Sequence, residues 1–189
     1  VVLDLLARTG LEPDRSLGEW ECLQLVWSRV VRGDGRPGVG SAEAREQTLL
    51  AVAASTMQLH ESRRPGAGVD AAALDALRRD HLLAPASPYR DQPDFAHDEV
   101  RRYATAILLV RGQSPTELLE ASGVPRWALS AATLACKGLL KAPGAQPPRV
   151  FVQLLSQFKP FAAAHGPRWS DVPVEAVLET PCAYECLKA

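Results

Sequence analysis

The stretch PDFAHDEVRRYATAILLVRG, residues 93–112, decides how the rest of the chain is read. From Asp98 onward, apolar residues recur at the spacing of one helix face. They are Val100, Tyr103, Ala104, Ile107 and Leu108. Gly112 follows the last of them and is typical of a helix end. The sequence therefore predicts a helix that begins at Asp98, with His97 immediately in front of it.

The segment before this helix is the one place in the sequence that reads as β structure. Two short apolar pieces, residues 82–84 and 94–96, flank a turn rich in Pro, Ser and Asp. Such an arrangement predicts a small β-hairpin. Pro85, Pro88 and Pro93 restrict its backbone pairing, because proline has no N–H to donate.

The first 92 residues otherwise carry helical patterns. Residues 16–31 are predicted to form a helix that Ser16 caps, with Glu19 completing a capping box. Its inward stripe is Trp20, Leu23, Trp27 and Val30. Ser41 and Asp70 are the predicted caps of two further helices, 42–59 and 70–80. The inward residues of the helix 42–59 are Leu49, Val52, Ala53 and Thr56.

Helical signals continue to the end of the chain. Residues 114–117, Ser-Pro-Thr-Glu, predict a capping box with proline in the first turn, and Gly123 closes that short helix. Pro125 opens the next helix, and residues 142–148 read as a linker. Pro160 predicts a kink or a break in the helix that follows. The predicted fold class is mainly α, with one small hairpin and a helical-repeat-like region over 113–189.

Composition bounds the classes of partner. The chain has 189 residues and a formal net charge of −1, so no general attraction to nucleic acid or to an anionic membrane is expected. No apolar run reaches the roughly 18 residues of a membrane span. The chain begins at Val1, inside what reads as structure, and we expect it to be an excerpt of a longer protein.

The four cysteines lack the spacing of a metal site. Cys22, Cys136, Cys182 and Cys186 form no CxxC pair, and the last two have no histidine nearby. We expect buried or half-buried thiols, no metal, and a reducing, cytoplasmic location.

The order of predicted elements leads to a resemblance. Two helices followed by a two-stranded wing is winged-helix order, and the run FAHDEVRRYATAILL resembles the end of the winged-helix domain in STAND-type nucleotide-binding proteins, the NACHT and NB-ARC ATPases. In that family a hydrophobic residue leads into a His-Asp pair and an aromatic follows in the next helix. Phe95, His97, Asp98 and Tyr103 match this pattern.

The resemblance implies a domain order and a role for two residues. Residues 1–36 would be the end of a helical lid, 37–112 the winged-helix domain and 113–189 the helical region that follows it. His97 would reach the β-phosphate of bound ADP in the resting state, and Asp98 would cap the helix and aim it. The chain would then be a regulatory segment of a signalling or defence ATPase that forms a homo-oligomer when a protein trigger activates it.

The nucleotide itself would have to be held elsewhere. A P-loop needs Gly-Lys followed by Ser or Thr, and none of the four lysines follows a glycine. No catalytic constellation such as HExxH or GxSxG is present. We therefore expect no enzyme and no cofactor within this chain, with ADP or ATP bound by a nucleotide-binding domain of the same polypeptide.

Two alternatives stay open. A plain α-helical interaction scaffold would make His97 incidental. A winged-helix DNA-binding regulator would read bases with the helix 70–80, which offers Arg78 and Arg79. That helix also carries Asp70, Asp75 and Asp80, so its charge is poorly suited to phosphate contacts.

Overall fold

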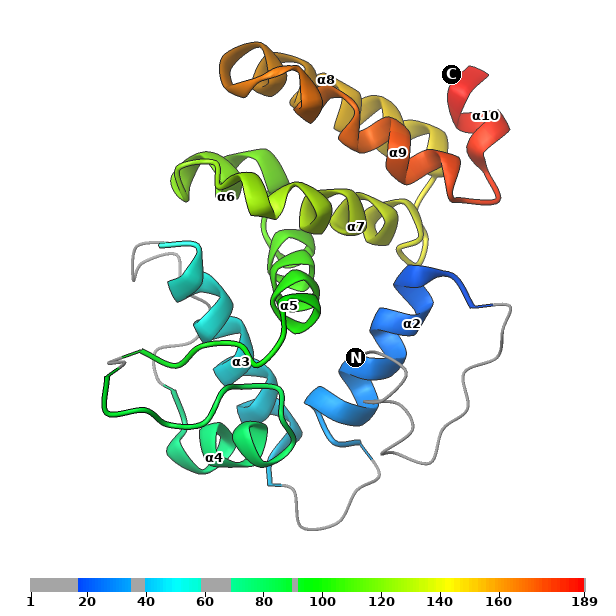
Figure 1. The fold of residues 1–189 in the computed structure, drawn as a ribbon. Helices are drawn as coiled ribbons and strands as arrows, with labels where there is room; N and C mark the ends of the chain where they lie inside the picture. The colour runs from blue at the N-terminus through cyan, green and yellow to red at the C-terminus, as the bar shows by residue number, and fades with distance from the viewer. Residues whose placement is uncertain (1–16, 35–39, 59–68, 90–91, 189) are drawn as a thin grey trace. The chain divides into compact units, whose positions relative to one another are not determined.

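The computed structural model describes residues 17–34, 40–58, 69–89 and 92–188. These residues form helices and one isolated β-bridge, which confirms the prediction of a mainly α chain (Figure 1). The backbone divides into two compact units, Val1–Ala104 and Thr105–Ala189. The boundary falls inside one helix, and the three-part division expected from the sequence stays a prediction.

The elements carry the labels of Figure 1. In chain order they are α2 (Glu19–Val26), η1 (Trp27–Val31), α3 (Ala42–Thr56), α4 (Ala71–Arg79), α5 (Asp98–Arg111), α6 (Pro115–Ala121), η3 (Arg126–Ala128), α7 (Leu129–Leu140), α8 (Pro147–His165), η4 (Pro167–Ser170), α9 (Val172–Leu178) and α10 (Ala183–Lys188).

In the first unit, α2 runs directly into η1, a single wide turn of π-helix. The predicted inward stripe is confirmed, because all four of its members are buried: Trp20, Leu23, Trp27 and Val30. The residue that precedes the helix is Gly18. The predicted cap Ser16 and the segment before it lie outside the described residues.

The caps of α3 and α4 form as predicted. The Ser41 hydroxyl accepts a hydrogen bond from the Ala44 N–H at 3.3 Å, and the Asp70 carboxylate accepts one from the Ala73 N–H at 2.7 Å. The two helices pack on each other. α3 is buried on nearly every side, whereas Thr56, predicted to face inward, is only half-buried.

Arg45 is the largest fully buried side chain among the described residues. Its Nε donates to the Val31 carbonyl at 2.7 Å, and its Nη2 donates to the Val30 carbonyl at 2.8 Å. The same Nη2 forms an ion pair with Asp80 at 2.6 Å. One guanidinium therefore joins the last turn of η1, helix α3 and the C-cap of α4. A positive charge is favourable beside carbonyls at a helix C-terminus.

The neighbouring residue, Glu46, makes a second buried polar contact between the same elements. Its carboxylate accepts hydrogen bonds from the Trp27 indole at 2.5 Å and from the Arg32 guanidinium at 2.7 Å. Because a buried charge is costly unless it is paired, these bonds fix α3 against η1 in one register.

The predicted β-hairpin is wrong. In the part of the chain that the structure describes, one antiparallel bridge joins Leu83 to Phe95, and no strand forms. The Ala84 N–H donates to Asp94 at 2.9 Å and the Ala96 N–H donates to Leu82 at 3.1 Å. The prolines at both ends of the intervening loop account for this, since a proline cannot extend the ladder.

In the second unit, the end of α6 is set by a Schellman motif. The Val124 N–H donates to the Leu119 carbonyl at 2.9 Å and the Gly123 N–H donates to the Glu120 carbonyl at 3.0 Å. Gly123 has a φ of +73°, as this motif requires, and it closes the helix as predicted. At the start of α6, however, the Ser114 side chain makes no capping bond and instead contacts the Thr116 hydroxyl.

Helices α7, α8 and α9 pack on one another to form the core of this unit (Figure 1). Lys137 of α7 is buried and forms an ion pair with Glu179 at 2.5 Å. Helix α8 runs unbroken from Pro147 to His165 with Pro160 inside it, so the alternative of a split helix is wrong. The proline costs one backbone hydrogen bond, and Phe158 and Phe161, both buried, hold the helix together across it.

We expect Arg45→Met to lower the free energy of unfolding by about 3–5 kcal/mol, because it removes the buried ion pair with Asp80 and the donor to two helix-end carbonyls. Urea unfolding followed by circular dichroism measures the change. Arg79→Met, at an exposed position, is the control and should change stability by less than about 0.5 kcal/mol. Equal midpoints for the two variants would show that the buried guanidinium contributes nothing.

Candidate functional site

The pattern of two aromatic residues and a His-Asp pair contains two buried and two exposed side chains. Phe95 and Tyr103 are 9% and 6% exposed, whereas His97 and Asp98 are exposed. Two aromatic side chains therefore anchor the segment in the first unit, and the two polar side chains between them face solvent.

The backbone on both sides of His97 is held by hydrogen bonds. The preceding residue, Ala96, donates to Leu82, next to the Leu83–Phe95 bridge. The His97 carbonyl accepts from the N–H groups of Val100 and Arg101 at 3.1 and 3.2 Å, and so begins helix α5. The imidazole is thus presented to solvent from a fixed point on the backbone.

The capping role expected of Asp98 stays a prediction. Asp98 is the first residue of α5, and its carboxylate pairs with Arg101 one turn later at 2.9 Å. The position in front of the helix belongs to His97. The charges of Asp98 and Glu99 in the first turn remain favourable, since the N-terminal end of a helix carries partial positive charge.

Arg102, which follows in the same helix, is engaged in the fold. It forms ion pairs with Glu99, at 2.9 Å, and with Glu19 of α2. The second pair joins residues 83 positions apart in the sequence. Both arginines of the Arg101-Arg102 pair therefore contact carboxylates.

The cysteines are free thiols. Cys136 and Cys186 are buried and Cys22 and Cys182 are half-buried, which confirms the expectation from their spacing. Burial raises the pKa of Cys136 far above its usual range and that of Cys186 to about 11. Since the thiolate is the reactive form, both thiols are inert near neutral pH. No group of three metal-ligating side chains occurs within the described ranges.

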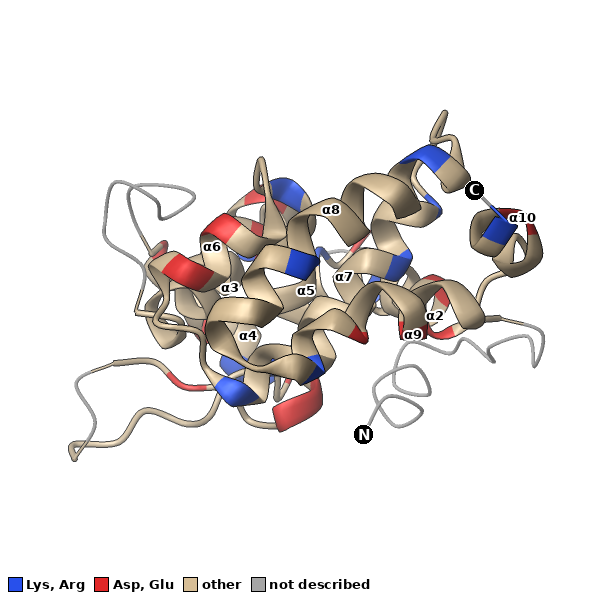
Figure 2. Ribbon diagram, turned by 90° about the horizontal axis from the view of Figure 1, so that it is seen from above, with Lys and Arg blue, Asp and Glu red and all other residues tan. Residues whose placement is uncertain are grey.

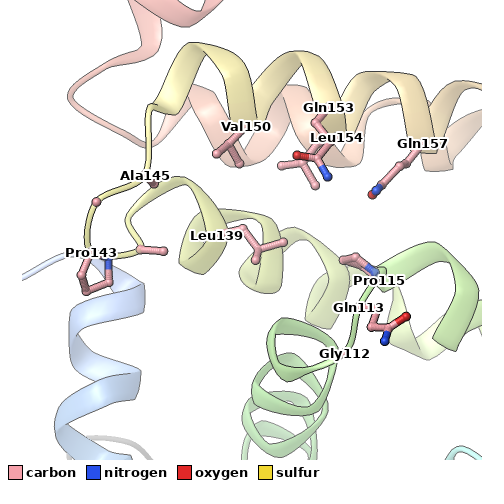
Figure 3. A pocket seen from close by; sticks show the side chains of 12 residues that line it. Gly112, Gln113, Pro115, Leu139, Pro143, Ala145, Val150, Gln153, Leu154 and Gln157 are labelled. Atoms are coloured by element: carbon pink, nitrogen blue, oxygen red, sulfur yellow. The ribbon is translucent and has the colours of Figure 1, made fainter.

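A neutral cavity of about 360 Å³ lies in the second unit. As Figure 3 shows, its walls come from α8, the end of α7, the loop after α7 and the turn before α6. Leu139, Val150 and Leu154 form an apolar surface, and Gln113, Gln153 and Gln157 supply amides. The Oε1 atom of Gln157 is buried without a hydrogen-bond partner among the described residues. This chemistry suits a neutral ligand with hydrogen-bonding groups.

A second cavity in the same unit, of about 520 Å³, is lined by cationic and aromatic residues. Arg126 comes from η3, His165 from the end of α8, and Arg168 and Trp169 from η4. The sequence offered no signal for this group. About forty positions separate Arg126 from the other three residues, and only the packing of α7 and η4 against neighbouring helices brings them to one cavity.

Comparison of the chain with models of protein families, with curated proteins and with solved structures finds no match. The likeness to STAND-type ATPases therefore rests on the residues of this chain alone. Within the described ranges, no helix combines the length and the apolar composition needed to cross a bilayer.

Burial of the Tyr103 phenol raises its pKa to about 12. The neutral phenol is therefore favoured in the folded state, and its contribution to stability is complete below the ordinary tyrosine pKa of about 10 and is lost as the pH rises toward 12. We expect Tyr103→Phe to reduce the alkaline loss of stability over this range by on the order of 1–2 kcal/mol.

Urea midpoints measured at steps across that pH range test this expectation. Tyr89→Phe is the matched control, because the Tyr89 side chain is 94% exposed and meets the same solvent when the chain unfolds. If both variants gave the wild-type curve, the Tyr103 hydroxyl would have to be solvated in the folded chain.

Proposed function

We propose that this chain is the regulatory segment of a larger STAND-like signalling or defence ATPase. In this proposal His97 contacts the phosphates of ADP held by a nucleotide-binding domain outside the chain. The observation that carries the proposal is the alternation of burial along one short segment: Phe95 buried, His97 and Asp98 exposed, Tyr103 buried.

The fixed backbone at His97 supports such a contact. A surface side chain loses conformational freedom when it binds a ligand, and an anchored backbone lowers that loss. The bridge at Phe95 and the first turn of α5 hold the chain immediately before and after His97. An imidazole N–H is a suitable donor to a phosphate oxygen, and a protonated ring adds charge assistance.

The contact would act by differential affinity. The resting arrangement would be favoured with ADP, because His97 then reaches the β-phosphate, and disfavoured with ATP, because that contact is lost. A ligand shifts a conformational equilibrium only by the difference in its interactions with the two states. One charge-assisted hydrogen bond contributes about 1.5–3 kcal/mol, which is enough for a shift of roughly one to two orders of magnitude.

The partners follow from the same family resemblance. They would be the nucleotide-binding domain of the same polypeptide, a protein trigger, and further copies of the protein in an activated homo-oligomer, all in the cytoplasm. In this proposal Asp98 caps the start of α5 and so aims His97, and its carboxylate also pairs with Arg101 at 2.9 Å.

An α-helical interaction scaffold is the second candidate. The last two helices favour it, because Leu178, Tyr184 and Leu187 are 60%, 70% and 53% exposed. Large exposed apolar side chains are typical of protein-binding surfaces. The DNA-binding alternative gains no such support. Arg78 of α4 pairs with Asp75, and basic and acidic residues occur in the same helices, α10 among them (Figure 2).

We expect His97→Ala in the full-length protein to release ADP about 10–100 times faster and to raise activity without a trigger. Mant-ADP chase measures the release, and ATP hydrolysis or oligomer formation measures the activity. The fold should be unaffected, because the imidazole is exposed, and thermal unfolding of the 189-residue chain checks this.

His81→Asn is the matched control. His81 is an exposed histidine of the same unit with a φ of +59°, a conformation that asparagine tolerates well. This control should keep wild-type ADP release. Unchanged ADP retention and resting activity in His97→Ala would reject the sensor role and leave the scaffold as the better explanation.

A further inference from the structure

The cationic cavity of the second unit is a feature that the proposed function does not use. Two segments of the chain line it, one with Arg126 and the other with His165 and Arg168. Leu129, Pro167 and Trp169 add apolar surface to this lining. Its volume of about 520 Å³ lies within the range of small-molecule sites.

Local backbone geometry places the three polar residues. After the Schellman motif of α6, Val124 has a φ of +54°, which is unfavourable for a β-branched residue, and it directs the chain through Pro125 into η3 and Arg126. At the other wall, Gly166 has a φ of +118° and reverses the chain at the end of α8, so that η4 packs back on that helix. The strain at Val124 is typical of positions where function requires a particular placement.

Trp169 makes the second wall rigid. Its side chain is 4% exposed and packs edge-on against Phe161 at a ring distance of 5.1 Å. His165 also contacts Phe161, with ring centroids 4.7 Å apart. His165 and Trp169, which line the cavity together with Arg168, thus both pack against one buried aromatic ring.

The two arginines differ from the five that form ion pairs within the described ranges. Arg32, Arg45, Arg78, Arg101 and Arg102 all form ion pairs with carboxylates. Arg126 and Arg168 form no ion pair within the described ranges, although both are exposed and line the same cavity. The carboxylate of Glu120 lies 3.9 Å from His165. Two uncompensated guanidinium groups therefore face one space.

The chemistry of these groups identifies the class of ligand. A guanidinium binds phosphate and carboxylate oxygens in a bidentate manner. Two guanidinium groups balance the charge of a phosphate monoester, about −1.5 to −2 at neutral pH, better than the single charge of a carboxylate. The apolar wall fits an organic group attached to that phosphate.

We propose that this cavity binds a small organic phosphate, with Arg126 and Arg168 holding the phosphate, His165 donating to it, and Leu129 and Pro167 contacting the organic part. The site belongs to the second unit and is independent of His97, so it stands whether or not the sensor role is correct.

Titration of the 189-residue chain with phenyl phosphate tests the proposal, by calorimetry and by the amide NMR signals of residues 165, 166, 168 and 169. Phenyl phosphate should bind and shift those signals. Inorganic phosphate, without the ring, and benzoate, with the ring but one charge, should each bind at least about fivefold more weakly. Arg126→Gln and Arg168→Gln should each weaken phenyl phosphate binding about tenfold.

Arg149→Gln is the matched control. Arg149 is an exposed arginine in the first turn of α8, about 24 Å along that helix from His165, and the change in net charge is the same. It should leave binding unchanged. The proposal is overturned if phenyl phosphate does not bind at millimolar concentration, if benzoate binds equally well, or if Arg149→Gln weakens binding as much as the cavity variants.

Discussion

The buried guanidinium of Arg45 is the contact on which the first unit depends. It satisfies the free carbonyls at the end of η1 and pairs with Asp80 at the end of α4. From Asp80 the chain runs directly to Leu83, which bridges to Phe95 and so fixes the approach to His97. The exposed imidazole is therefore positioned through a short series of contacts that begins at one charged group in the core.

Local signals predicted the local structure well. Some features depend only on neighbours within a few residues, so the sequence predicts them. They are the caps at Ser41 and Asp70, the stripe from Trp20 to Val30 and the helix from Asp98. Arg45 and Glu46 were not predicted to be buried, since charged residues near a helix start normally face solvent. Their burial depends on carbonyl and indole groups that only tertiary packing brings near. The predicted hairpin does not form because prolines lie between its two apolar pieces, and a proline has no N–H to donate to a strand pair.

The candidate sites also contain features that local sequence predicts and features that only tertiary packing creates. Helical spacing predicted that Tyr103 lies on the buried face of its helix, because the residues that define this face are all in the same helix. Spacing gave no sign of the ion pair between Asp98 and Arg101. The cavity with Arg126 and Arg168 could not be predicted from the sequence, because the residues that line it come from two distant segments and form no motif.

The wide turn of η1 makes the length of this segment as important as its composition. Its backbone bond from Arg32 to Trp27 spans five residues, one more than in an α-helix. Removing a single residue there would let the turn close with α-helical spacing and would shift the Val30 and Val31 carbonyls that Arg45 contacts. Substitutions that keep the apolar character of the turn preserve this alignment, whereas insertions and deletions destroy it. Natural variation at η1 should therefore substitute residues in this segment without changing its length.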